Sequence, residues 1–154
     1  RSVSTPFWDV GIDKEQLIKD KYLYDDNGYE GGLNLLNKLG LTTQMSNKRV
    51  LVTNKADNHF DADKELDVVV HSPKTVINKE NKRYLMVLDI LEQINDAPID
   101  IEDPYRLIRD YINQLGLDYS KLFVLANNYY DKDTVTQLEN IVEVKYSKGK
   151  VYGK

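Results

Sequence analysis

The sequence contains no cysteine. This absence excludes disulfide bonds, thiolate metal ligands and a cysteine nucleophile. Long apolar runs are also missing, because none approaches the roughly 20 residues that a membrane-spanning helix needs. No secretory signal or lipidation motif is recognisable, so we expect a cytoplasmic protein with no membrane contact.

The motifs of common catalytic centres are missing as well. The sequence has no G-x-S-x-G nucleophile turn and no glycine-rich phosphate loop. His59 and His71 are the only histidines, and neither has a recognisable serine partner. His59 lies in the acidic segment DNHFDAD, which lacks the spacing and the central glycine of a calcium loop. We therefore expect no catalytic residue, no metal site and no cofactor.

The net charge of −4 does not favour a free-standing nucleic-acid-binding protein. Local basic residues can still meet a phosphate backbone by charge attraction. The candidates for such contact are Lys48 and Arg49, and Lys145 and Lys148 near the C-terminus. The alternative is that these side chains only keep the surface soluble.

What the sequence does contain is the material of one globular domain with a substantial core, since its 154 residues are 41% hydrophobic and 30% charged. Hydrophobic periodicity and turn residues predict helices and strands in an α+β order. The predicted helices span residues 13–24, 30–39, 79–95, 104–115 and 119–128, with another from about 133, and the predicted strands span 49–53, 67–72 and 74–77.

This order predicts a small, mostly antiparallel sheet, packed with a helix pair before it and a helical bundle after it. The first two strands are expected to pair as a hairpin with a long loop. Residues 1–12 lack periodicity and predict an irregular arm, whereas the basic residues 145–154 predict a flexible tail. Gly40 occupies the position of a helix-ending glycine, and Asp103-Pro104 is a strong helix start.

The most distinctive stretch is NGYEGGLNLLNKLGLTTQMSNKRVLVTN, residues 27–54. Its segment GLTTQ, residues 40–44, is too apolar for an ordinary surface loop and too rich in hydroxyl groups for plain core. Thr42 and Thr43 can bond the free carbonyls at the end of the preceding helix, and Gln44 can satisfy a buried backbone pair. The alternative is a direct contact with a partner.

An enzymatic alternative depends on four carboxylates and would be a divergent metal-dependent nuclease or nucleotidyltransferase. Asp61 and Asp63 form an acid-x-acid pair of the kind that holds the magnesium ions of an incoming nucleotide. Glu143 and Lys145, with Asp67 as a further acid, would instead suit a nuclease. However, the Gly-Ser dipeptide expected before a nucleotidyltransferase pair is missing, and Glu143 is far from Asp67 in the sequence. We therefore favour a non-catalytic role.

The segment GYEGGLNLLNKLGLTTQMSNKRVLVTN resembles the effector part of AbiEi-like type IV antitoxins, a bacterial family with relatives described as transcriptional regulators. Gly28, Tyr29 and Gly32 match the Gly-Tyr-x-x-Gly pattern of that family. Residues 39–44 match its Leu-Gly-Leu-Thr-Thr-Gln, and residues 50–54 match the strand that ends near Thr-Asn. The similarity continues weakly through DVVVHSPK, RYLMVLDILEQI and SKLFVLANNYYDKDTVTQLENIV.

This resemblance implies a non-catalytic domain of a toxin–antitoxin or abortive-infection regulator, which neutralises or regulates a nucleotidyltransferase-like toxin. It also implies repression of its own operon through a winged helix, which these 154 residues do not contain. The family motif supplies the candidate partner-contact residues. They are Tyr29, Gly32, Gly40, Leu41, Thr42, Thr43 and Gln44.

Overall fold

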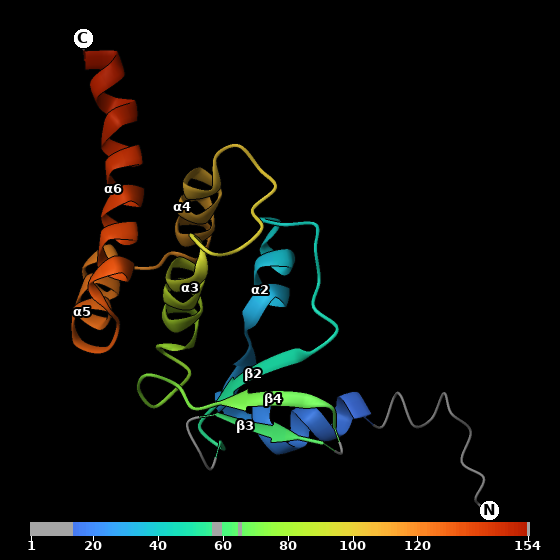
Figure 1. Cartoon of the computed structure of the whole chain (residues 1–154). Helices are drawn as coiled ribbons and strands as arrows, with labels where there is room; N and C mark the ends of the chain where they lie inside the picture. The colour runs from blue at the N-terminus through green and yellow to red at the C-terminus, as the bar shows by residue number, and fades with distance from the viewer. Residues whose placement is uncertain (1–13, 57–59, 65, 154) are drawn as a thin grey trace, which may run out of the picture. The chain divides into compact units, whose positions relative to one another are not determined.

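A computed structural model describes residues 14–56, 60–64 and 66–153, without the side chains of residues 60–62 and 143–153 (Figure 1). The predicted arm of residues 1–12 lies outside this description. The chain divides into two compact units, and each is described by itself. We call Arg1–Glu30 with Asn47–Lys82 the sheet unit, and Gly31–Ser46 with Arg83–Lys154 the helical unit. That the two fold as one domain stays a prediction.

The sheet unit begins with a helical stretch and continues into a sheet, as Figure 1 shows. The sheet has four strands. The helical stretch starts at residue 14 and closes with a π-helix and a 3₁₀ turn. The sheet has the order β1-β2-β4-β3, with β1 and β3 each antiparallel to their neighbours and β2 parallel to β4. The elements are η1 (Lys19–Leu23), η2 (Tyr24–Asp26), β1 (Gly28–Glu30), β2 (Arg49–Thr53), β3 (Phe60–Asp63) and β4 (Val68–His71).

The predicted α+β class with a mostly antiparallel sheet is confirmed, but the predicted hairpin between the first two long strands is wrong. β2 and β4 run parallel, with Arg49 opposite Val68 and Val52 opposite His71. The connection between them contains β3, which pairs with β4 on the side away from β2. The sequence does not reveal β3, because Phe60–Asp63 reads FDAD, and aspartate is depleted in strands.

The core of the sheet unit forms where the helical stretch packs against one face of the sheet. β4 alternates buried and half-buried residues, as a strand with one covered face does. The buried cluster consists of Ile18, Tyr22, Leu51, Leu66, Val68 and Val70. The helical stretch therefore supplies two residues of this small apolar core, β4 supplies two, and the other two are Leu51 of β2 and Leu66.

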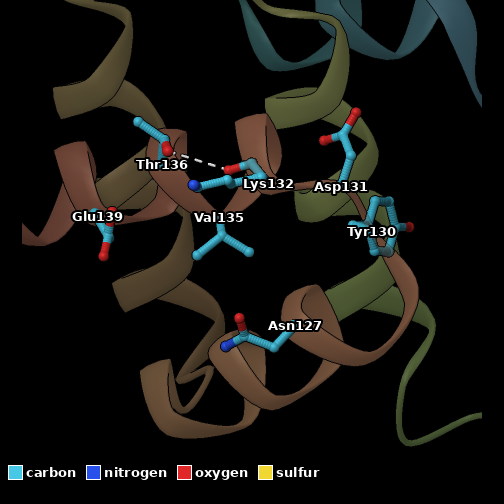
Figure 2. A pocket seen from close by; sticks show the side chains of 7 residues that line it. All are labelled: Asn127, Tyr130, Asp131, Lys132, Val135, Thr136 and Glu139. Carbon is cyan, nitrogen blue, oxygen red and sulfur yellow. Dashed lines mark hydrogen bonds between the residues drawn. The ribbon is translucent and has the colours of Figure 1, made fainter.

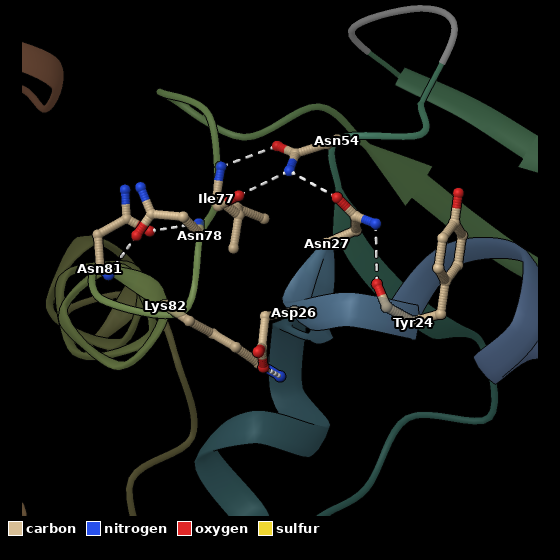
Figure 3. A network of polar contacts seen from close by, with 8 residues as sticks. All are labelled: Tyr24, Asp26, Asn27, Asn54, Ile77, Asn78, Asn81 and Lys82. Carbon is tan, nitrogen blue, oxygen red and sulfur yellow. Dashed lines mark hydrogen bonds and ion pairs between the residues drawn. The ribbon is translucent and has the colours of Figure 1, made fainter.

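Asn54, directly after β2, ties the 74–77 segment to the sheet unit through its side chain (Figure 3). Its Nδ2 donates to the carbonyl of Ile77 at 2.8 Å, and its Oδ1 accepts from the N–H of Ile77 at 2.8 Å. The predicted strand at 74–77 is wrong, because this segment has no ladder in the described structure. A side-chain amide makes the pair of hydrogen bonds that a neighbouring strand would have made.

The same network continues on both sides of Asn54. Its Nδ2 also reaches Oδ1 of Asn27 at 3.3 Å, while Nδ2 of Asn27 donates to the carbonyl of Tyr24 at 2.8 Å. Beyond Ile77, Asn78 and Asn81 exchange backbone-to-side-chain hydrogen bonds of 2.8 Å each, a reciprocal cap at the start of the next helix. Figure 3 shows that these asparagines connect three separate segments of the sheet unit.

The helical unit consists of α2 (Gly32–Leu39), α3 (Lys82–Gln93), whose first residue belongs to the sheet unit, α4 (Pro104–Leu115), α5 (Tyr119–Tyr129) and α6 (Lys132–Gly153). α4 has the predicted bounds. α6 continues through residues 145–153, so the predicted tail has a helical backbone, and its flexibility stays a prediction. No helix in the described part of the chain is long and apolar enough to cross a membrane.

Capping residues set the ends of these helices as the sequence predicts. Gly40 ends α2 with φ of 92°, and the N–H of Leu41 donates to the carbonyl of Leu36 at 3.0 Å. Asp103 caps α4 by accepting from the N–H of Arg106 at 3.2 Å. The helices enclose one apolar core of Leu35, Leu36, Leu41, Val87, Leu88, Ile90, Leu91, Ile94, Ile108, Ile112, Leu122, Ala126, Leu138 and Ile141.

Replacing Asn54 by alanine should destabilise the protein by about 1–3 kcal/mol, because two backbone groups of Ile77 lose their partners. Urea unfolding followed by circular dichroism measures this loss. Asn47→Ala, at an exposed position, is the matched control and should change stability by no more than about 0.5 kcal/mol. Equal unfolding midpoints for the two variants would contradict the role given to Asn54.

Candidate functional site

The candidate site is the segment Gly40–Ser46 of the helical unit, which we call the motif segment. It follows α2 and has no regular secondary structure. Leu41 anchors its first half, because this side chain is 0% exposed and packs in the apolar core. The carbonyl of Leu41 accepts from the N–H of Asp100, in the connection between α3 and α4, at 3.0 Å.

The carboxylate of Asp100 then fixes the next two residues. Its Oδ2 accepts from the N–H of Thr43 at 2.6 Å, from the hydroxyl of Thr43 at 2.8 Å and from the hydroxyl of Thr42 at 3.1 Å. These hydrogen bonds, with the backbone N–H of Thr43 contributing most, hold the pKa of Asp100 below its usual value. Three donors that converge on one carboxylate oxygen favour its ionised form and restrict the backbone of the segment.

The hydrogen-bond partner predicted for the two threonines is therefore wrong. Thr42 and Thr43 bond Asp100 rather than the free carbonyls of the preceding helix. Backbone groups bond the free carbonyls at the end of α2 instead. The N–H of Leu41 donates to the carbonyl of Leu36, and the N–H of Gly40 donates to the carbonyl of Asn37, each at 3.0 Å. The side chain of Asn37 in turn donates to the carbonyl of Thr42 at 3.1 Å.

The second half of the motif segment reaches the surface but stays tethered. The N–H of Gln44 donates to the hydroxyl of Thr42 at 3.1 Å, and the N–H of Ser46 donates to Oδ1 of Asn34 on α2 at 2.8 Å. Between these two bonds, Gln44 is exposed and Met45 is 65% exposed. The sequence predicts that Gln44 satisfies a buried backbone pair, but this residue is exposed.

Met45 is the residue at this site that sequence reasoning missed. A signal for it existed: it is the one large apolar side chain in the second half of a segment rich in polar residues. The motif segment thus divides into a buried anchor of Leu41 and Thr42 and an exposed tip of Gln44 and Met45. Of the predicted contact residues in this segment, Gly40, Thr43 and Gln44 are exposed, whereas Leu41 and Thr42 are buried.

The Gly-Tyr-x-x-Gly residues that precede α2 have structural environments. At Gly28 an added Cβ would lie 2.6 Å from the carbonyl oxygen of Val52 and 2.7 Å from that of Tyr22, so only glycine fits there. Tyr29 is 4% exposed in β1 of the sheet unit. Gly32 opens α2 with φ of 63°, in the left-handed region that favours glycine. These positions shape the backbone, and Tyr29 is buried within the sheet unit.

The basic residues proposed to contact nucleic acid are in different situations. Arg49 donates to both carboxylate oxygens of Glu30, at 3.2 and 3.1 Å, and also pairs with Glu15. Burial opposes its charge, but the bonds to Glu30 and Glu15 outweigh burial and raise the pKa of Arg49. Arg49 is thus committed to two carboxylates, whereas Lys48 forms an exposed pair with Asp67, at 3.2 Å. Lys145 and Lys148 lie on α6, with side chains outside the description.

The carboxylates of the enzymatic alternative are not gathered in the described structure. Asp63 accepts from Lys21 at 2.7 Å and from the Tyr22 hydroxyl at 2.6 Å. Burial opposes the charge of Asp63, but these bonds, with the N–H of Leu66, lower its pKa to about 2. Among the described residues no three His, Asp or Glu side chains form a group that could hold a metal ion. The side chains of Asp61 and Glu143 lie outside the description.

Comparison of the chain with protein-family models, with curated proteins and with solved structures finds no match. The geometry of the site is therefore the main guide to its function.

Asp63 should contribute an acid-sensitive part of the stability. Because its folded pKa of about 2 lies below the usual 3.8, its contribution is fully present above about pH 4 and is lost as the pH falls towards 2. In Asp63→Asn the drop in urea midpoint between pH 6 and pH 3 should be smaller than in the unaltered protein. Asp67→Asn, at an exposed lysine pair, is the control and should leave the drop unchanged. An unchanged drop in Asp63→Asn would contradict this account.

Asp100 should protect the backbone of the motif segment from hydrogen exchange. In Asp100→Ala the amide of Thr43 loses its acceptor, so its exchange, followed by nuclear magnetic resonance, should become several-fold faster. Glu102→Ala changes an exposed residue in the same connection and should leave the Thr43 amide protected. Equal Thr43 exchange rates in both variants would show that Asp100 does not hold the segment.

Proposed function

We propose that this chain is a non-catalytic, antitoxin-like domain that binds and neutralises or regulates a nucleotidyltransferase-like toxin in the bacterial cytoplasm. The resemblance of residues 28–54 to AbiEi-like antitoxins supplies the class of partner. The observation that carries the proposal is the motif segment, in which Asp100 and Asn34 fix the backbone while Gln44 and Met45 remain exposed.

A tethered loop with exposed side chains suits protein binding for an energetic reason. Association must order the groups that meet at an interface, at a cost of about 0.5–1.5 kcal/mol for each flexible side chain. The backbone of the motif segment is already ordered by side-chain hydrogen bonds before a partner arrives. Methionine is unbranched and polarizable, so Met45 can fit an irregular apolar pocket, and Gln44 can both donate and accept hydrogen bonds beside it.

The charge of the segment favours a protein over a nucleic acid as its partner. Residues 40–46 contain no charged side chain, in a chain where 30% of the residues are charged. Phosphate backbones are bound chiefly through lysine and arginine, and Arg49 already pairs with two glutamates. Operator contact through a winged helix, or through Lys48, Lys145 and Lys148, stays a prediction.

A non-catalytic role also agrees with the state of the carboxylates. Asp63 is paired with Lys21, and Asp67 is paired with Lys48. Each of these carboxylates has an evident structural partner, and Asp63 has a low pKa that suits a permanent ion pair rather than a general base. No observation on the described residues favours the nuclease or nucleotidyltransferase alternative enough to propose it.

Co-expression in a bacterial host tests the proposal. The nucleotidyltransferase-like protein encoded beside this chain should arrest growth when expressed alone, and the unaltered chain should restore growth. Gln44→Ala combined with Met45→Glu should restore it at least tenfold less efficiently, because a charge at position 45 opposes entry into an apolar pocket.

Lys38→Glu, an exposed change on α2, is the matched control and should rescue growth as well as the unaltered chain. Immunoblots and thermal unfolding of each variant establish equal abundance and folding. The proposal is contradicted if the unaltered chain gives no rescue, or if the Gln44 and Met45 variant rescues growth fully.

A further inference from the structure

A hollow of about 350 Å³ lies on the helical unit between the end of α5 and the first half of α6 (Figure 2). One wall comes from the end of α5 and the turn that follows it. The other wall comes from four residues of α6: Lys132, Val135, Thr136 and Glu139. Figure 2 shows Val135 directed into the hollow, with Lys132 and Glu139 on the α6 side of it.

The four α6 residues lie along one side of the helix, and Val135 also packs against the apolar core of the helical unit. Their spacing of three, four and seven positions places them on one side of α6. The opposite side carries Leu138 and Ile141, which are 0% exposed in the core of the helical unit. Val135 is half-buried, whereas Lys132 and Glu139 are exposed, and neither charge has an ion-pair partner among the described side chains.

The charges on this face are complementary to those of the same face on a second, antiparallel copy of α6. In an antiparallel pair of α6 helices, Lys132 of one copy lies opposite Glu139 of the other, and the reverse pair forms at the same time. A two-fold axis between Val135 and Thr136 generates both contacts and places the two Val135 side chains beside the Thr136 methyl groups. A parallel pair would instead oppose like charges, so the pattern selects the antiparallel, isologous arrangement.

We propose that two copies of this chain associate through this face of α6, with reciprocal Lys132–Glu139 ion pairs and the Val135–Thr136 layer at the centre. Apolar and aromatic side chains lie beside these charges, because Val135 and Tyr130 both line the hollow and are half-buried. Tyrosine is enriched in protein interfaces, and a second copy covers apolar area that is otherwise in water.

The association is weak, because exposed ion pairs contribute little and are screened by salt. Sedimentation velocity at low salt, over a concentration series reaching about 1 mM, should show a monomer–dimer equilibrium. Lys132→Glu and Glu139→Lys should each weaken it at least about tenfold, because every single reversal opposes like charges at two symmetric contacts. Lys38→Glu changes the net charge as Lys132→Glu does, but on exposed α2, and should leave the equilibrium unaltered.

The decisive samples are those that restore opposite charges at positions 132 and 139 of the two copies. The double variant Lys132→Glu with Glu139→Lys should dimerise like the unaltered chain. An equimolar mixture of the two single variants should form a heterodimer, since the altered residue of each copy meets an opposite charge on the other. Thermal unfolding confirms that each variant is folded. The proposal is overturned if the unaltered chain stays monomeric throughout, if the single variants dimerise normally, or if neither the double variant nor the mixture recovers.

Discussion

The geometry of the candidate site depends on one carboxylate oxygen. Oδ2 of Asp100 receives three donors from Thr42 and Thr43, although Asp100 itself is exposed and contributes nothing to the apolar core. The hydrogen bond between the Asp100 N–H and the carbonyl of Leu41 adds a backbone link to the same connection. The ionised aspartate thus holds the backbone of Thr42 and Thr43 in place after α2. Gln44 and Met45 follow these bonded residues and are exposed.

The most distinctive stretch of the sequence, residues 27–54, contributes to both units. β1 and β2 belong to the sheet unit, while α2 and the motif segment between them belong to the helical unit. The stretch therefore contains two of the places where the chain passes from one unit to the other. This explains why it is dense in residues with strict requirements. Gly28 permits the close approach of β1 to Val52, and Gly40 permits the left-handed end of α2. Asn54 supplies the pair of hydrogen bonds to Ile77 that a neighbouring strand would have made.

Much of the fold could be predicted from the sequence, because the ends of helices are set by residues that lie at those ends. Asp103-Pro104 and Gly116 determine both ends of α4, and Gly40 ends α2 where a C′ glycine would. The errors all concern partners that are distant in the sequence. The direction of β2 against β4 depends on β3, whose acidic sequence conceals a strand, and the state of 74–77 depends on the side chain of Asn54. Likewise, no local rule connects Thr42 and Thr43 with an aspartate more than fifty positions away.

We propose that Asp100 prepares the motif segment for a protein partner. Calorimetric titration of the purified chain with the nucleotidyltransferase-like toxin tests it most directly, because Asp100→Ala leaves Gln44 and Met45 chemically intact. The account predicts at least about tenfold weaker binding for Asp100→Ala, with a more unfavourable binding entropy, and unchanged binding for Glu102→Ala. If Asp100→Ala binds the toxin as tightly as the unaltered chain, the ordered motif segment is not what the partner recognises.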